Sequence, residues 1–195
     1  MCEDSDMKIA GAKPSRSVAR AQADNTETIR AELEQEKQSG NLDRARTLGM
    51  RLAEEFDRAQ GEFAFGLDSG EDGEVKLQRR LLLCFAVAVG LEQFTVSALV
   101  ARTALNVFYN TLKKIDVEFY EDLNNTGAFS FYYLALRRGM DVERRIGQTF
   151  AMLCSRDGDP VYQELGEALY CRFLASVRGE IRRQNLLREP KDGQA

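Results

Sequence analysis

The chain contains no histidine among its 195 residues. Histidine is the commonest general base in enzymes, the usual partner of a catalytic serine or cysteine, and a frequent ligand of zinc and haem. Catalysis would therefore have to depend on carboxylate, lysine, tyrosine or arginine side chains. The Gly-x-x-x-x-Gly-Lys and Gly-x-Gly-x-x-Gly loops that bind nucleotide phosphates are missing as well. These absences favour a non-catalytic protein, and we predict no cofactor.

Proline and long apolar runs are also scarce. Only three prolines occur, at positions 14, 160 and 190, so long helices can form without interruption between them. The longest apolar run covers residues 81–91, whereas a bilayer-spanning helix needs roughly 20 residues. The first six residues include three acidic ones, which is not typical of a secretory signal. We expect no transmembrane segment.

The four cysteines stand far apart, at positions 2, 84, 154 and 171, and none belongs to a Cys-x-x-Cys pair. Three of them lie in apolar helical stretches, where a cysteine acts as a small buried hydrophobic residue. Unpaired, reduced cysteines are typical of the cytosol. We therefore expect a cytoplasmic protein without disulfides.

The two ends of the chain differ from its middle. Residues 1–23 contain few large hydrophobic side chains and are predicted to form a disordered tail, as are residues 188–195. The basic segments at 8–20 and 178–188 lack the interleaved aromatic residues of a nucleic-acid-binding surface. Since the whole chain is acidic, with a pI near 5.1, nucleic acid is not an expected partner.

Residues 24–60 are predicted to form an N-terminal helical hairpin. The segment Asp24-Asn25-Thr26-Glu27 fits a capping box that starts a helix ending near Gln38. The second helix begins at Asn41 and has one apolar face at helical spacing, made of Leu42, Ala45, Leu48, Leu52, Phe56 and Ala59. Residues 61–73 contain four glycines and are predicted to be an acidic loop.

Residues 74–187 are predicted to form a helical core. The stretch 81–89 is apolar on every face, which indicates a helix surrounded by other helices, at about 74–93. Asp159 followed by Pro160 is a strong start signal for the last helix. Together these patterns predict an all-α, single-domain bundle of about seven helices around the apolar helix at 74–93, preceded by the N-terminal hairpin.

Two patterns suggest sites. Eight aromatic residues lie between positions 108 and 133, either as plain core or as the lining of a pocket for an anionic small molecule. The pocket hypothesis names Arg102, Tyr109, Tyr132 and Glu92 as ligand-binding residues. The carboxylate of Glu92 follows the apolar run, and it is expected either to pair with a cation such as Arg102 or to reach water where the helix ends.

Glu-x-x-Glu spacing occurs twice and places two carboxylates on one helix face. The pairs are Glu118 with Glu121 and Glu164 with Glu167. Such a pair either binds Mg²⁺, as a carboxylate-dependent hydrolase would require, or forms an ordinary solvated face. The metal interpretation requires the four carboxylates to converge on one point.

The absence of catalytic motifs leaves three functional hypotheses. The first is a non-catalytic protein-interaction or regulatory domain that binds another protein or itself, for which an exposed apolar stripe on the hairpin between Ile29 and Ala59 would be evidence. The second is the aromatic pocket for an anionic ligand. The third is the Mg²⁺-dependent hydrolase.

Overall fold

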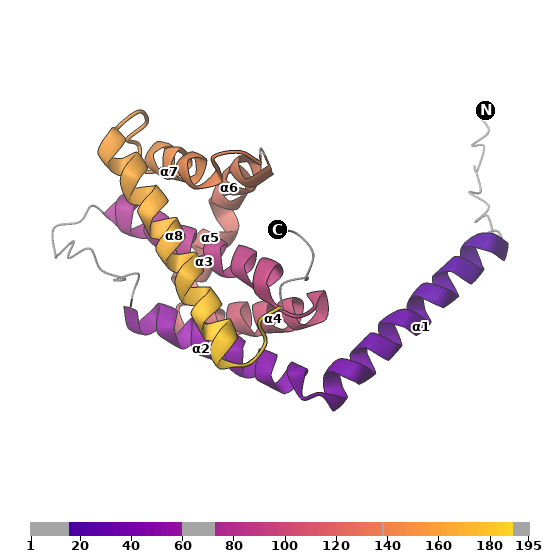
Figure 1. The fold of residues 1–195 in the computed structure, drawn as a ribbon. Helices are drawn as coiled ribbons and strands as arrows, with labels where there is room; N and C mark the ends of the chain where they lie inside the picture. Colours follow the sequence, from indigo (N-terminus) through magenta and orange to yellow (C-terminus); the bar gives the residue numbers. More distant parts are fainter. Residues whose placement is uncertain (1–15, 60–72, 138, 189–195) are drawn as a thin grey trace, which may run out of the picture.

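The computed structural model describes residues 16–59, 73–137 and 139–188 (Figure 1). Within these ranges all regular elements are helices, eight in number, and one isolated bridge pairs Thr95 with Leu187. The helices are α1 (Arg16–Gln38), α2 (Asn41–Ala59), α3 (Gly73–Phe94), α4 (Ala98–Ile115), α5 (Val117–Asn125), α6 (Ala128–Arg137), α7 (Val142–Leu153) and α8 (Pro160–Arg183). The predicted all-α fold is confirmed. Most of the predicted 61–73 loop and of the two predicted tails lies outside the described residues.

Capping side chains set the starts of α4 and α8, the second of them at the Asp159 start signal that the sequence predicts. The Ser97 hydroxyl accepts a hydrogen bond from the Val100 amide at the start of α4, and Asp159 accepts one from Val161 at the start of α8. Such bonds satisfy amides that have no partner inside the helix. Asp141 precedes α7 but makes no side-chain capping bond, because its backbone is left-handed, with φ of 50°.

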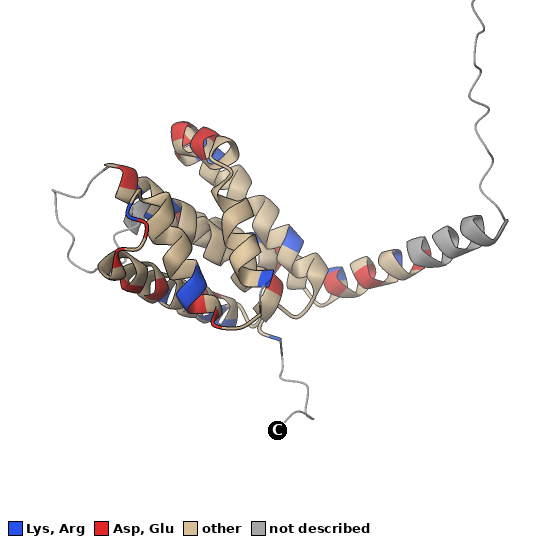
Figure 2. Ribbon diagram, turned by 90° about the horizontal axis from the view of Figure 1, so that it is seen from above, with Lys and Arg blue, Asp and Glu red and all other residues tan. Residues whose placement is uncertain are grey.

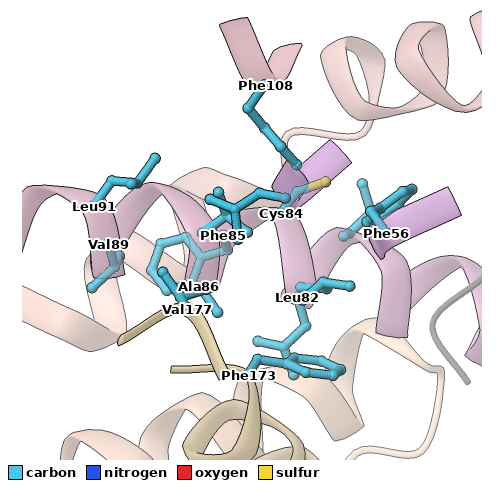
Figure 3. Close-up of a cluster of buried hydrophobic side chains, with 14 of the residues drawn as sticks. Phe56, Leu82, Cys84, Phe85, Ala86, Val89, Leu91, Phe108, Phe173 and Val177 are labelled. Atoms are coloured by element: carbon cyan, nitrogen blue, oxygen red, sulfur yellow. The ribbon is translucent and has the colours of Figure 1, made fainter. Parts of the chain in front are cut away.

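Helix α3 is the centre of the bundle, and every residue from Leu81 to Leu91 is buried. It packs against α4, α6, α7 and α8. Figure 3 shows its side chains between Phe56 of α2, Phe108 of α4 and Phe173 of α8. Its apolar run is nevertheless short, and none of the helices in the described ranges is long and apolar enough to cross a membrane.

The N-terminal hairpin is not formed as predicted. Helix α1 begins at Arg16, eight residues before the capping box, and it extends away from the bundle instead of folding back along α2 (Figure 1). The apolar face of α2 is buried against α4, which offers a larger apolar surface than the thin stripe of α1. We call the projecting helix the α1 arm.

Glycines allow two helix pairs to approach closely. A Cβ atom built at Gly49 of α2 would overlap the carbonyl oxygen of Ala104 on α4. A Cβ atom at Gly147 of α7 would overlap the carbonyl oxygen of Gln163 on α8 and lie 3.0 Å from the amide nitrogen of Glu167. In both places the obstacle is backbone, which cannot rotate away.

A single arginine ties three helices together. The Arg80 guanidinium of α3 forms an ion pair with Asp116 and lies 4.0 Å from the ring centre of Phe119 and 5.1 Å from that of Phe56. Asp116 also accepts a hydrogen bond from the Phe119 amide and so caps α5. Partial burial by itself would raise the pKa of Asp116, but the hydrogen bonds from Arg80 and Phe119 and the charge of Arg80 together lower that pKa.

The cysteines differ in exposure. Cys84 and Cys154 are buried and free, as predicted, and burial raises the pKa of the Cys84 thiol, which keeps it protonated. Cys171 is exposed on α8, contrary to the prediction, because it faces outward between the buried Tyr170 and Phe173. Cys2 lies outside the described residues.

The α1 arm should be the least protected helix of the protein. It has little of the tertiary packing that stabilises short helices in water, whereas α3 opens only when the bundle unfolds. In dilute solution we expect amides of residues 28–36 to exchange hydrogen at least about 100-fold faster than those of residues 81–91. Hydrogen exchange with mass spectrometry measures this difference, with α2 as the internal control. Equal protection of the two segments would contradict a projecting arm.

Candidate functional site

A cavity of about 410 Å³ lies beside the start of α4, and we call it the Arg102 cavity. Its apolar wall is made mostly of small side chains, and its polar groups come from four separate segments. It is lined by Ala88, Leu91, Glu92, Ala98, Ala101, Arg102, Leu105, Tyr133 and Arg188.

The chain that follows α8 supplies one side of this cavity. The Val96 amide donates to the Leu186 carbonyl at 3.0 Å, and the Arg188 amide donates to the Phe94 carbonyl at 2.7 Å. The Arg188 Nε also donates to the Thr95 carbonyl at 3.1 Å. These bonds hold the end of the described chain against the α3–α4 connection and place the Arg188 guanidinium at the cavity.

The lining of the Arg102 cavity carries more positive than negative charge. Two guanidinium groups, Arg102 and Arg188, face a single carboxylate, that of Glu92. Among the described residues neither Glu92 nor Arg102 takes part in an ion pair. Burial, together with the nearby negative charge of Glu92, raises the pKa of Tyr133, so its hydroxyl stays protonated and can donate a hydrogen bond.

A second cavity, of about 350 Å³, lies between α4, α5 and α6, and we call it the Tyr109 cavity. It is lined by Tyr109, Tyr120, Leu123, Asn124, Gly127, Phe129 and Ser130. The Lys113 ammonium lies 5.6 Å from the ring centre of Tyr120. Burial raises the pKa of Tyr109, and neighbouring Cys84, Tyr133 and Tyr120 add to the shift, so this phenol also stays neutral.

Both cavities are lined in part by residues of α4 and α6. On α4 the spacing of Arg102, Leu105 and Tyr109 places them on one helix face. On α6 the rings of Phe129 and Tyr133 share a face, with centres 6.4 Å apart. The Phe85 ring of α3 contacts both of these rings and forms the floor beneath them.

The four residues predicted to form one ligand site lie in three different places in the structure. Glu92 and Arg102 line the same cavity, and Tyr109 lines the adjacent one. Glu92 is exposed near the end of α3 and reaches water, the simpler of the two outcomes expected for it.

Tyr132 lines neither cavity, so the prediction that it is a ligand-binding residue of this site is wrong. The side chain is completely buried against Phe85, with ring centres 5.1 Å apart, and its hydroxyl has no hydrogen-bond partner among the described residues. Tyr133, one position further along α6, is rotated by about 100° and lines the Arg102 cavity instead. The aromatic cluster pointed to this region, but the helix rotation decides which tyrosine is accessible.

The glutamates with Glu-x-x-Glu spacing do not form a metal site. No three acidic, cysteine or histidine residues within the described chain lie close enough together to hold a metal ion. Glu118, Glu121 and Glu164 are exposed on their helices, so they form solvated faces. The magnesium hypothesis required these carboxylates to converge, and within the described chain they do not.

A third surface combines exposed apolar side chains with an arginine that has one buried nitrogen without a hydrogen-bond partner. Phe131 and Leu134 of α6 and Met152 of α7 are 48%, 53% and 40% exposed. With Arg145 and Asp157 they line a cavity of about 270 Å³, which we call the α6–α7 patch. The Arg145 Nη1 atom is buried there and has no hydrogen-bond partner in the described ranges.

The α1 arm also carries an exposed apolar pair. Ile29 is 55% and Leu33 is 44% exposed, and their spacing places them on one face of the helix. Glu32 borders this face on one side, whereas Arg30 and Lys37 border it on the other. Figure 2 shows charged residues of both signs along the described part of the arm.

Comparison of the chain with protein-family models, with curated proteins and with solved structures found no match.

Proposed function

We propose that this protein is a non-catalytic interaction module that assembles with further copies of itself, the α1 arm of one copy docking in the α6–α7 patch of the next. The observation that carries the proposal is the exposed Ile29 and Leu33 pair on a helix that extends away from its own bundle. Helices outside a fold are marginally stable, and an amphipathic face gains stability when a partner groove covers it.

The α6–α7 patch has the chemistry that this arm would require. Its exposed Phe131, Leu134 and Met152 side chains suit an apolar pair at i and i+4. The patch also offers one cation, Arg145, and one anion, Asp157, while the arm presents acidic and basic residues on opposite edges of its stripe. A carboxylate such as Glu32 would supply an acceptor for the unpartnered Arg145 nitrogen.

Pairing of two arms with each other is less favourable. The exposed apolar pair spans little more than one helical turn, whereas a coiled coil needs apolar positions sustained over at least about three heptads. An arm that enters a different surface of the next copy makes a heterologous contact, which generates rings or open chains.

Association of this kind should be weak. Full burial of one Ile or Leu side chain contributes about 1.5–3 kcal/mol, and both side chains are already about half buried in the single copy. The two together would therefore add about 1.5–3 kcal/mol, which corresponds to about 10–150-fold in affinity. We expect assembly that depends steeply on protein concentration.

The arm variant Ile29→Lys with Leu33→Lys should lose this assembly. We expect the apparent dissociation constant to rise at least about 30-fold in sedimentation velocity experiments, because the apolar contact is lost and two charges would have to be buried. The matched control is Ala31→Lys with Gln35→Lys, which adds the same charge at the same spacing on the opposite face of the helix. Circular dichroism verifies that the bundle of each variant is folded.

Mixing two defective variants tests the head-to-tail arrangement directly. The arm variant keeps an intact patch, and a patch variant, Phe131→Lys with Leu134→Lys, keeps an intact arm. Neither should self-associate, but the mixture should form one-to-one dimers. A mixture that stays monomeric, or a wild-type protein that is monomeric at every concentration, overturns the assembly.

A further inference from the structure

We propose that the Arg102 cavity is a binding site for an amphipathic monocarboxylate, a linear or compact apolar molecule with one anionic head group. The carboxylate would lie between Arg102 and Arg188, and the apolar body would lie against Leu91, Leu105 and the alanines of the wall. This activity is separate from the assembly proposed above, since the arm and the α6–α7 patch do not line the cavity.

The electrostatics of the cavity favour an anion. The lining carries two arginines against one glutamate, which gives a net charge of +1 and matches a ligand with a single negative charge. Ala98, the first residue of α4, also lines the cavity, so the positive end of the helix dipole lies near the head-group position. Planar guanidinium groups bind carboxylates in a bidentate geometry.

The guanidinium groups are positioned for this purpose in different ways. Arg188 is held by the hydrogen bond from its Nε to the Thr95 carbonyl, which orients the side chain before a ligand arrives. Arg102 projects from the second turn of α4 and forms no ion pair within the described chain. The protonated hydroxyl of Tyr133 is available as a further hydrogen-bond donor.

The walls explain why the ligand needs an apolar body. Ala88, Ala98 and Ala101 stand where larger side chains would fill the space, and Leu91 and Leu105 complete an apolar surface. The volume of about 410 Å³ is within the range of ligand pockets, which is about 300–1,000 Å³.

The head group can be tested with three probes that share one tail: octanoate, octanol and octylamine. Their binding is measured by NMR titration on the folded arm variant Ile29→Lys with Leu33→Lys, so that failure of the assembly has no influence on the result. We expect octanoate to bind at least about tenfold more tightly than octanol, the contribution of a charge-assisted hydrogen bond, and octylamine to bind most weakly. Equal binding of the three probes overturns the proposal.

Substitutions then locate the site. Arg102→Gln combined with Arg188→Gln should reduce octanoate binding to the level of octanol, while Arg144→Gln, which removes an exposed arginine of α7, should leave it unchanged. Ala98→Phe, at an exposed position on the first turn of α4, should fill the cavity and weaken binding of both octanoate and octanol without unfolding the bundle. Unaltered octanoate binding in either the arginine variant or the phenylalanine variant overturns the assignment.

Discussion

Replacing Phe85 with alanine should lower the free energy of unfolding by about 3–5 kcal/mol, the usual cost of removing a buried phenylalanine ring. Phe85 is completely buried at the middle of α3 (Figure 3). Its ring lies between 5.1 and 6.2 Å, centre to centre, from four other aromatic rings, those of Phe129, Tyr132, Tyr133 and Tyr170. The substitution therefore leaves a cavity where α3, α6 and α8 meet.

Urea denaturation followed by circular dichroism measures this loss. Phe85→Leu conserves most of the volume and should cost less than about 1.5 kcal/mol. Phe131→Ala makes the same chemical change at a position that is 48% exposed, so its effect should be much smaller. If Phe85→Ala and Phe131→Ala destabilised the protein equally, the aromatic cluster around Phe85 would not be the core.

Two identical glycine-to-alanine substitutions should have opposite effects on stability. At Gly147 the added methyl group would overlap the Gln163 carbonyl, so α7 and α8 would have to separate, at a cost of about 1–3 kcal/mol or more. At Gly179 of α8 a Cβ atom would meet nothing within 4 Å, so alanine should stabilise the helix by up to about 1 kcal/mol. The two variants should therefore differ by about 1–4 kcal/mol.

Thermal and urea unfolding of the two variants provide the comparison. Because the chemical change is the same, differences in side-chain size or hydrophobicity cannot explain opposite signs. Gly49→Ala offers a second test at the α2–α4 contact, where the overlap is again with backbone, and it should resemble Gly147→Ala. A stabilising Gly147→Ala would mean that α7 and α8 do not approach each other as closely as described.

The helical bundle itself was predictable because its main signals are local. The apolar run at 81–89 can be satisfied only by burial on all sides, and this places α3 at the centre whatever the arrangement of its neighbours. Ser97 and Asp159 mark helix starts because their side chains bond to amides only two or three residues away. Such interactions do not depend on the tertiary structure.

The start of α1 shows where a local signal fails. The capping box at Asp24–Glu27 is compatible with a helix start, but the preceding residues, rich in alanine and arginine, favour helix too, so the helix continues back to Arg16. The direction of α1 was beyond sequence reasoning for another reason. Both α1 and α4 could have covered the apolar face of α2, and the outcome depends on which surface buries more apolar area.

For the candidate sites, the amino-acid sequence by itself determined the helical class, the central helix and the region of the aromatic cluster, since these follow from periodicity and short-range bonds. Only the tertiary structure decided that Tyr133 rather than Tyr132 lines the Arg102 cavity, and that Arg188, from beyond α8, joins Arg102 there. The rotation of α6 and the path of the chain after α8 result from the packing of whole helices, and packing depends on residues distant in the sequence.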